Sequence, residues 1–193
     1  MVQSQNTSRR VLGIDPGSQF TGIGIVDFQN KKLSAVHHEV IRLPITENHS
    51  IRLKVLFDRL SQIIQLHSPQ LLAIENVFLA KNPSSALKLG QVRGVILLSA
   101  SHHSLPVAEY SSTQVKRLIS GFGLAGKSDM AAWVSRLLGP VEVERHDATD
   151  ALAIAIAHHF LSGGQLNAQI SIQSNPGGSG KRRSLAQYLV GSK

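Results

Sequence analysis

The stretch Val11-Leu-Gly-Ile-Asp-Pro-Gly-Ser18 places an acid at the end of a short apolar run, directly before a turn. An apolar run of this length that stops at Pro and Gly is typical of a buried strand. Asp15 is then expected at the carboxyl end of that strand, where Pro16 and Gly17 turn the chain. Taken alone, Asp15 fits a turn as well as it fits a functional site.

Three more acids occur in positions that suit a shared site. Glu75 closes the apolar run that begins at Leu71, and a carboxylate at the end of such a strand is costly to bury without a partner. Asp147 and Asp150 open a stretch with a helical pattern up to Ile156. Residues three apart lie on one helix face, so both carboxylates can point the same way.

The pair also has a simpler interpretation, in which Asp147 caps the helix and Asp150 is the returning acid of a capping box. The coincidence of three separate acidic segments favours a common metal centre instead. Clustered carboxylates repel one another unless cations hold them together, and oxygen ligands suit Mg²⁺ or Mn²⁺. Two such ions roughly 3.5–4 Å apart can clamp the attacking and leaving oxygens of a phosphodiester. The four acids therefore predict a metal-dependent nuclease.

Length and composition narrow the class of protein. The 193 residues suit one domain with a real core, and 42% apolar residues is ordinary for a globular protein. No apolar run reaches the ~18 residues of a membrane span, and the polar opening of the chain does not resemble a secretory signal. The chain contains no cysteine, which excludes disulfides and thiolate metal sites and agrees with a cytoplasmic location.

The formal net charge of +8 is unevenly distributed. Residues 11–163 carry 14 basic and 12 acidic side chains, so most of the excess lies outside them. A basic surface around an acidic centre suits a substrate with a phosphate backbone, although a merely basic protein would have the same balance. The basic residues outside residues 11–163 are Arg9, Arg10, Lys181, Arg182, Arg183 and Lys193.

The apolar periodicity predicts an α/β fold, a mixed sheet flanked by helices, in the order β-β-β-α-β-α-β-α-α-α. We expect a domain at 11–163 between a flexible extension at 1–10 and a flexible basic tail at 164–193. A helix capped by Ser50 is expected to end before Pro69. The strands are expected at 11–15, 21–28, 33–43, 71–75 and 107–110, and the other helices at 83–101, 112–120, 128–138 and 147–161.

The segment Gly121-Phe-Gly-Leu-Ala-Gly-Lys-Ser128 matches the phosphate-loop pattern of nucleotide enzymes. That pattern requires a strand immediately before the loop, whereas the residues from Val115 to Ser120 have helical spacing. We therefore expect neither ATP nor GTP here. A glycine turn that leads into a helix still presents free N–H groups, so the loop can hold a DNA backbone phosphate.

Several short motifs occur along residues 11–160. Each is weak evidence for a family when taken alone, but the combination is specific. They are Gly13-Ile-Asp-Pro-Gly-Ser18 with Thr21-Gly22, Ile74-Glu-Asn-Val-Phe78, Ala86-Leu-Lys-Leu-Gly-Gln-Val-Arg-Gly94, Gln114-Val-Lys116, Gly121-x-Gly-x-Ala-x-Lys127 and Asp147-Ala-x-Asp-Ala-Leu-Ala153. In this order and spacing they resemble the RuvC family of Holliday-junction resolvases, in the ribonuclease H-like superfamily.

The resemblance implies a homodimeric endonuclease that nicks two opposed strands of a four-way DNA junction. It also implies two Mg²⁺ ions per subunit, for which Mn²⁺ can substitute, and a branch-migration helicase of the RuvA and RuvB type as partner. By position, the four acids match the metal-binding acids of the family. Asp15, Glu75 and Asp150 are then expected to hold and bridge the ions, with Asp147 completing the site.

Three more residues match family positions by the same resemblance. Phe78 corresponds to an aromatic residue near the junction centre, where a ring can stack on unpaired bases. Lys116 and Lys127 correspond to lysines beside the active site. A core phenylalanine and solvated lysines are the ordinary alternatives. His146 adjoins the acid pair, but Asp147 occupies the position that matches a ligand, so we interpret His146 as supporting or incidental.

Two other functions remain open on the sequence. The Asp15 turn also resembles the phosphate loop of sugar-kinase and actin-like ATPases, but those proteins need two such lobes and this length supplies one. A non-catalytic protein that binds four-way junctions would need only the basic surface. Four aligned carboxylates would then have no explanation.

Overall fold

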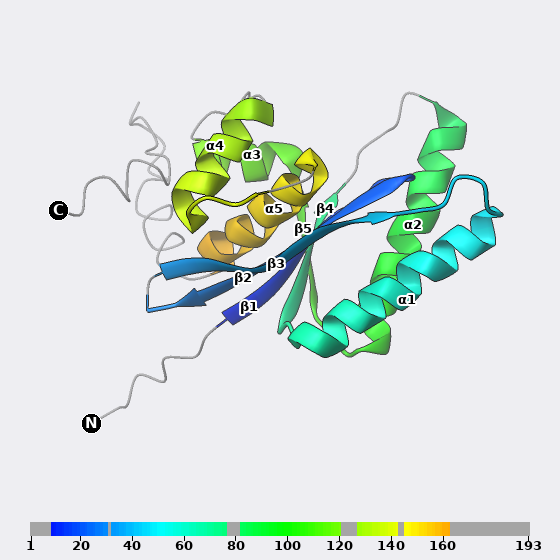
Figure 1. Cartoon of the computed structure of the whole chain (residues 1–193), viewed down its shortest axis with the longest axis horizontal. Coiled ribbons are helices and arrows are strands. Elements are labelled where there is room, and N and C mark those ends of the chain that lie inside the picture. The colour runs from blue at the N-terminus through cyan, green and yellow to red at the C-terminus, as the bar shows by residue number, and fades with distance from the viewer. Residues whose placement is uncertain (1–8, 31, 77–81, 121–126, 143–144, 163–193) are drawn as a thin grey trace, which may run out of the picture.

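The computed structural model of the chain describes residues 9–30, 32–76, 82–120, 127–142 and 145–162 (Figure 1). Within these residues the elements follow the order expected from the sequence. The strands are β1 (Arg9–Asp15), β2 (Phe20–Gln29), β3 (Lys32–Arg42), β4 (Leu71–Asn76) and β5 (Val107–Ser111). The helices are α1 (His49–His67), α2 (Pro83–His102), α3 (Ser112–Ser120), α4 (Lys127–Leu138) and α5 (His146–Ser162).

The strands form one mixed sheet in the order β3-β2-β1-β4-β5. The first three are antiparallel neighbours, and β1, β4 and β5 run parallel to one another. Because Ile14 is in register with Ile74, the residues that follow them, Asp15 and Glu75, reach the same edge of the sheet. The predicted mixed sheet with flanking helices is confirmed, and its parallel centre brings two of the predicted acids together.

Helices cover both faces of the sheet (Figure 1). On one face, α1 and α2 pack over a core that includes Leu12, Ile14 and Leu56. On the other face, α4 and α5 pack over a second core that includes Val11 and Leu152. Successive residues of β1 belong to opposite cores, as expected when side chains alternate across a strand. None of the described helices is long and apolar enough to cross a membrane.

Helix α5 lies directly against the backbone of β1 and β2. A Cβ atom built on Gly22 would overlap the carbonyl oxygen of Asp147, and one built on Gly13 would overlap that of Ala151. Gly22 is also the residue paired with Asp15 in the antiparallel ladder. The missing side chains therefore allow the first turn of α5 to reach the strand end that carries Asp15.

We expect the substitution Gly22→Ala to destabilise the protein by about 3 kcal/mol, because the added methyl group must displace either β2 or α5. The same displacement moves the acidic residues of α5, so the variant should also lose activity. Urea unfolding measures the loss of stability. Ser34→Thr adds one methyl group at an exposed position of β3 and should stay within about 0.5 kcal/mol of the parent protein. Equal stabilities for Gly22→Ala and the parent would contradict the close contact.

Two element starts, those of β1 and α1, differ from the sequence expectations by two residues, and several other boundaries differ by one. Strand β1 begins at Arg9 rather than Val11, so Arg9 and Arg10 belong to the sheet and the predicted extension at 1–10 is wrong for them. The Arg10 guanidinium donates to both carboxylate oxygens of Asp27, at 2.8 Å each, and to the carbonyl oxygen of His67 at 2.7 Å. Asp27 on the neighbouring strand thus compensates the charge of Arg10, and the local sequence pattern does not reveal this pairing.

Helix α1 begins two residues earlier than expected, at His49, with Asn48 rather than Ser50 at the cap position, so Ser50 lies inside the first turn. The predicted tail at 164–193 and residues 1–8 lie outside the described part of the chain.

Candidate metal centre

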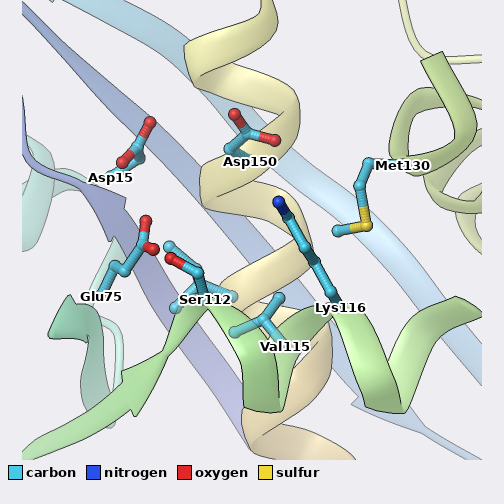
Figure 2. Close-up of a pocket in the computed structure, with 8 residues that line it drawn as sticks. Asp15, Glu75, Ser112, Val115, Lys116, Met130 and Asp150 are labelled. Atoms are coloured by element: carbon cyan, nitrogen blue, oxygen red, sulfur yellow. The ribbon is translucent and has the colours of Figure 1, made fainter. Parts of the chain in front are cut away.

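A pocket of about 270 Å³ opens at the edge of the sheet where β1 and β4 end. Asp15 enters it from β1, Glu75 from β4 and Asp150 from α5 (Figure 2). Ser112, Val115 and Lys116 of α3 form another wall, together with Met130 and Ile154. Three of the four predicted acids, separated by 60 and 75 residues in the sequence, thus face one space.

The electrostatics of the pocket are set by carboxyl groups that are partly withdrawn from solvent and lie close to one another. Burial, followed by the charges of Glu75, Asp150 and Asp147, raises the pKa of Asp15 from 3.8 to about 8. Burial also raises the pKa of Glu75, and the charge of Asp150 adds to that effect. Asp15 and Glu75 share a hydrogen bond, which requires that one of the two carboxyl groups carries a proton.

This charge pattern fits a divalent cation. All three side chains supply hard oxygen donors, and an ion among them would offset both the burial of the Asp15 carboxylate and the repulsion from its neighbours, which together raise its pKa. Within the described residues, no three Asp, Glu or His side chains already converge closely enough to hold an ion. The donor chemistry of the pocket therefore suits Mg²⁺ or Mn²⁺, although the carboxylates are not drawn together as they would be around a bound ion.

Asp147 stands beside the pocket rather than in its wall. Helix α5 begins at His146, so Asp147 lies within the first turn and not at a cap. Its Oδ2 accepts a hydrogen bond of 3.1 Å from Nε of Arg145. Its charge still contributes to the raised pKa of Asp15. His146 is exposed.

Lys116 is placed at the pocket as the sequence predicted. Helix α3 begins with a capping box, in which the backbone N–H of Ser111 donates to Oε1 of Gln114 at 2.8 Å and that of Gln114 donates to the Ser111 hydroxyl at 3.2 Å. This cap fixes the start of the helix, and Lys116 follows within two turns. Its amine points into the space between the carboxylates (Figure 2), and its charge opposes the rise in the pKa of Glu75.

The other predicted DNA contacts cannot be placed in the pocket. Phe78 lies outside the described residues, as does the glycine-rich segment at 121–126. Lys127 is the first residue of α4, but its side chain is also outside the described set.

Arg93 is a site residue that the sequence analysis missed. Its guanidinium reaches from α2 to the end of β4, where Nη1 donates to the carbonyl oxygen of Glu75 at 2.9 Å. Nη2 forms an ion pair of 2.7 Å with Glu109 of β5, and only 19% of the Arg93 side chain is exposed. Arg93 therefore holds the backbone of Glu75 in place. The available signal was a charge between the apolar residues Val92 and Val95 of α2.

The element before the glycine-rich segment is helix α3, as its spacing predicted. A phosphate loop of the nucleotide enzymes follows a strand, so this context does not favour ATP or GTP. We expect that saturating ATP leaves the melting temperature unchanged and is not hydrolysed. A ligand at about 100 times its dissociation constant would stabilise the fold by ~2.7 kcal/mol, which thermal unfolding detects readily. A clear ATP-dependent rise would restore the nucleotide hypothesis.

The model of a family described as crossover junction endodeoxyribonuclease RuvC matches residues 11–158. A protein of that name from Pelobacter propionicus is 46% identical over 149 residues, which cover 77% of this chain and 85% of the relative. The corresponding protein of Citrifermentans bemidjiense is 44% identical over 153 residues, covering 79% and 93% of the two chains.

Solved structures give a similar picture. The structure of T. thermophilus RuvC in complex with a Holliday junction substrate superposes with a TM-score of 0.75 at 32% identity, covering 80% of this chain and 94% of the other. The yeast mitochondrial Holliday junction resolvase shares the fold, with a TM-score of 0.50 at 15% identity, covering 88% of this chain and 90% of the other.

Proposed function

Because the chain belongs to the RuvC family of crossover junction endodeoxyribonucleases, we propose that it resolves Holliday junctions by nicking two opposed strands of four-way DNA. The observation that supports this most strongly is the convergence of Asp15, Glu75 and Asp150 on one pocket, where burial and the neighbouring carboxylates raise the pKa of Asp15 to about 8. A site that collects negative charge in this way is suited to a cation-assisted reaction on a phosphodiester.

We assign a separate role to each residue of the site. We assign Asp15, Glu75 and Asp150 to hold two Mg²⁺ ions, which Mn²⁺ can replace, with Asp147 completing the set. When bound, these ions activate a water molecule and stabilise the leaving oxygen. Lys116, on the wall formed by α3, is placed to bind an oxygen of the scissile phosphate and to offset the charge that develops there. Phe78 and Lys127 are proposed as further DNA contacts from their family positions alone.

The reaction is hydrolysis, so no side chain has to act as a nucleophile. The oxygen of water bonds to phosphorus, the bond from phosphorus to the 3′ oxygen breaks, and the leaving oxygen takes up a proton. The products are a 5′-phosphate and a 3′-hydroxyl, which can be ligated. Arg93 contributes indirectly, because it fixes the backbone that carries Glu75.

Two symmetric nicks require two equivalent sites, and we propose that the active form is a homodimer. Helix α2 offers a face for the second copy. Leu87 and Leu98 on this helix are 66% and 60% exposed and lie on one side of it, with the exposed Gly94 between them. The opposite side of α2 carries Val92 and Ile96 into the core.

We further propose that the enzyme acts in the cytoplasm, in a complex with a branch-migration helicase of the RuvA and RuvB type. The support for this partner is the family resemblance, since a junction must be moved to a cleavable position before it is cut.

The decisive test is cleavage of a synthetic four-way junction and of a linear duplex of the same sequence, each with Mg²⁺ and with EDTA. We expect paired nicks at symmetric positions in the junction with Mg²⁺, no nicks in EDTA, and little cutting of the duplex. Tight junction binding without any metal-dependent nick would instead identify a non-catalytic junction-binding protein.

A further inference from the structure

A second cationic feature lies beside the acid pocket, on the side of the sheet away from Lys116. Phe20 begins β2, in register with Arg42 of β3. The guanidinium carbon of Arg145 lies 3.8 Å from the centroid of the Phe20 ring, and that of Arg42 lies 5.5 Å from the same centroid. One aromatic ring therefore carries two arginines that come from distant parts of the chain.

This feature is continuous with the site. Phe20 is two residues from Gly22, which lies under the first turn of α5 and opposite Asp15. In the strand order β3-β2-β1-β4-β5, the two arginines stand at the β2–β3 side of the acids. Lys116 follows β5 and stands at the other side. A DNA strand that crosses the acids thus has cationic groups at both sides of the pocket.

The Arg145 guanidinium is held in a defined orientation. Its carbon lies over the Phe20 ring, and the hydrogen bond of 3.1 Å from Nε to Asp147 anchors one edge. The other edge carries the two terminal nitrogens, and 40% of the Arg145 side chain is exposed to solvent. A planar fork with one edge anchored and the other accessible is suited to the bidentate binding of a phosphate.

The charges also favour an anion at this place. Two guanidinium groups on one ring repel each other, and Asp147 compensates only one of them. A phosphate that binds both would remove the repulsion, and the ring would contribute cation–π attraction that water does not screen fully.

We propose that Arg145 and Arg42, held by Phe20, bind the backbone phosphate next to the scissile one on the cleaved DNA strand. This inference rests on the proposed function, because it supposes that the acids act on DNA. It assigns to Arg145 a binding role of its own, beyond neutralising Asp147. Without such a role, removal of its charge would alter the metal response of Asp147 and leave DNA binding intact.

The test is the salt dependence of junction binding, followed by fluorescence anisotropy in EDTA. Replacing Arg145 by Gln should weaken binding about 3- to 10-fold at low salt and lower the slope of log K against log salt by ~0.9, the value for one lost phosphate contact. Arg42→Gln should have a similar effect. Arg136→Gln is the matched control, because it removes an arginine that stacks on Trp133, 5.3 Å from the ring centroid, in α4. It should leave the slope unchanged.

The same substitution in an Asp147→Asn background separates the two roles of Arg145. If Arg145 binds phosphate, the slope should still fall by ~0.9 when Asp147 carries no charge. An unchanged slope in that background would overturn the proposal, and so would an equal fall in Arg136→Gln. A parent protein that binds junctions with a normal slope but never nicks them would refute the proposed function while leaving the phosphate contact measurable.

Discussion

Asp15→Asn, Glu75→Gln and Asp150→Asn should each reduce nicking of a four-way junction by at least about 10³-fold, while junction binding persists. Each substitution removes one negative charge and almost no volume, so the fold and the basic surface remain. What disappears is a ligand from a pocket that all three side chains line. A nicking assay with Mg²⁺ and a gel-shift assay in EDTA, on the same preparations, measure the two halves of this prediction.

The matched control is Asp58→Asn, since Asp58 pairs with Lys54 on the surface of α1 and faces no other acid of the site. It should nick at the parental rate. Asp147→Asn should lose less activity than the other three, because Asp147 stands beside the pocket and already pairs with Arg145. Parental nicking by any of the three pocket variants would remove that residue from the metal centre.

The second large effect concerns the metal-free protein, in which the contribution of Asp15 to stability should fall as the pH rises from about 4 to about 8. The carboxyl group of Asp15 has a pKa of about 8 in the folded protein, against 3.8 for an unperturbed aspartate. Between these values the folded chain holds a proton that the unfolded chain has released, so protonation favours folding at low pH. The contribution of this proton to the free energy of unfolding falls by up to ~1.4 kcal/mol per pH unit and is lost above about pH 8.

Buried histidines act in the opposite direction at acid pH, and this limits where the effect can be seen. Burial, with the charges of His159 and Arg9, lowers the pKa of His158 to about 4. This histidine therefore makes the fold more stable as the pH rises from about 4 to 6.5. At pH 6.5 about half of the unfolded histidine is still protonated, so its contribution fades only about one pH unit higher. The difference between the parent protein and Asp15→Asn at each pH isolates the carboxylate, because both carry the same histidines.

Urea unfolding in EDTA at several pH values should show that Asp15→Asn is more stable than the parent protein at pH 8, by several kcal/mol at most. Near pH 4 the two should be similar, because Asp15 is then protonated in the parent. Asp58→Asn serves again as control and should follow the parental curve. Identical pH profiles for Asp15→Asn and the parent would mean that burial and the neighbouring carboxylates do not raise the pKa of Asp15. Mg²⁺ should restore stability to the parent at pH 8.

Local patterns in the sequence were sufficient to predict the order of helices and strands and to locate most of the acids that line the pocket. An apolar run that ends in an acid locates a strand terminus, and this logic placed Asp15 and Glu75 correctly at one edge of the sheet. Helical spacing placed Asp150 on the face of α5 that lines the pocket. The roles of these residues as metal ligands remain predictions, as do those of Phe78 and Lys127.

The residues that escaped prediction depend on contacts between distant segments. Arg93 supports Glu75 across 18 positions, and Arg145 meets Phe20 across 125, through a fold that no local pattern specifies. The start of β1 was missed for the same reason. Two arginines read locally as a charged extension, and only Asp27 on the neighbouring strand makes Arg10 a member of the sheet.

The contact between α5 and the glycines of β1 and β2 bears on how this enzyme can be engineered. The helix that carries Asp147 and Asp150 is positioned by main-chain atoms, whereas α1 and α2 are positioned by large side chains on the opposite face. A designer who seeks a thermostable variant can therefore repack the apolar side chains of the α1–α2 layer and retain the arrangement of the acids, provided that Arg93 of α2, which holds the backbone of Glu75, is kept. The glycine-lined layer offers no such freedom, since its spacing is set by the backbone itself.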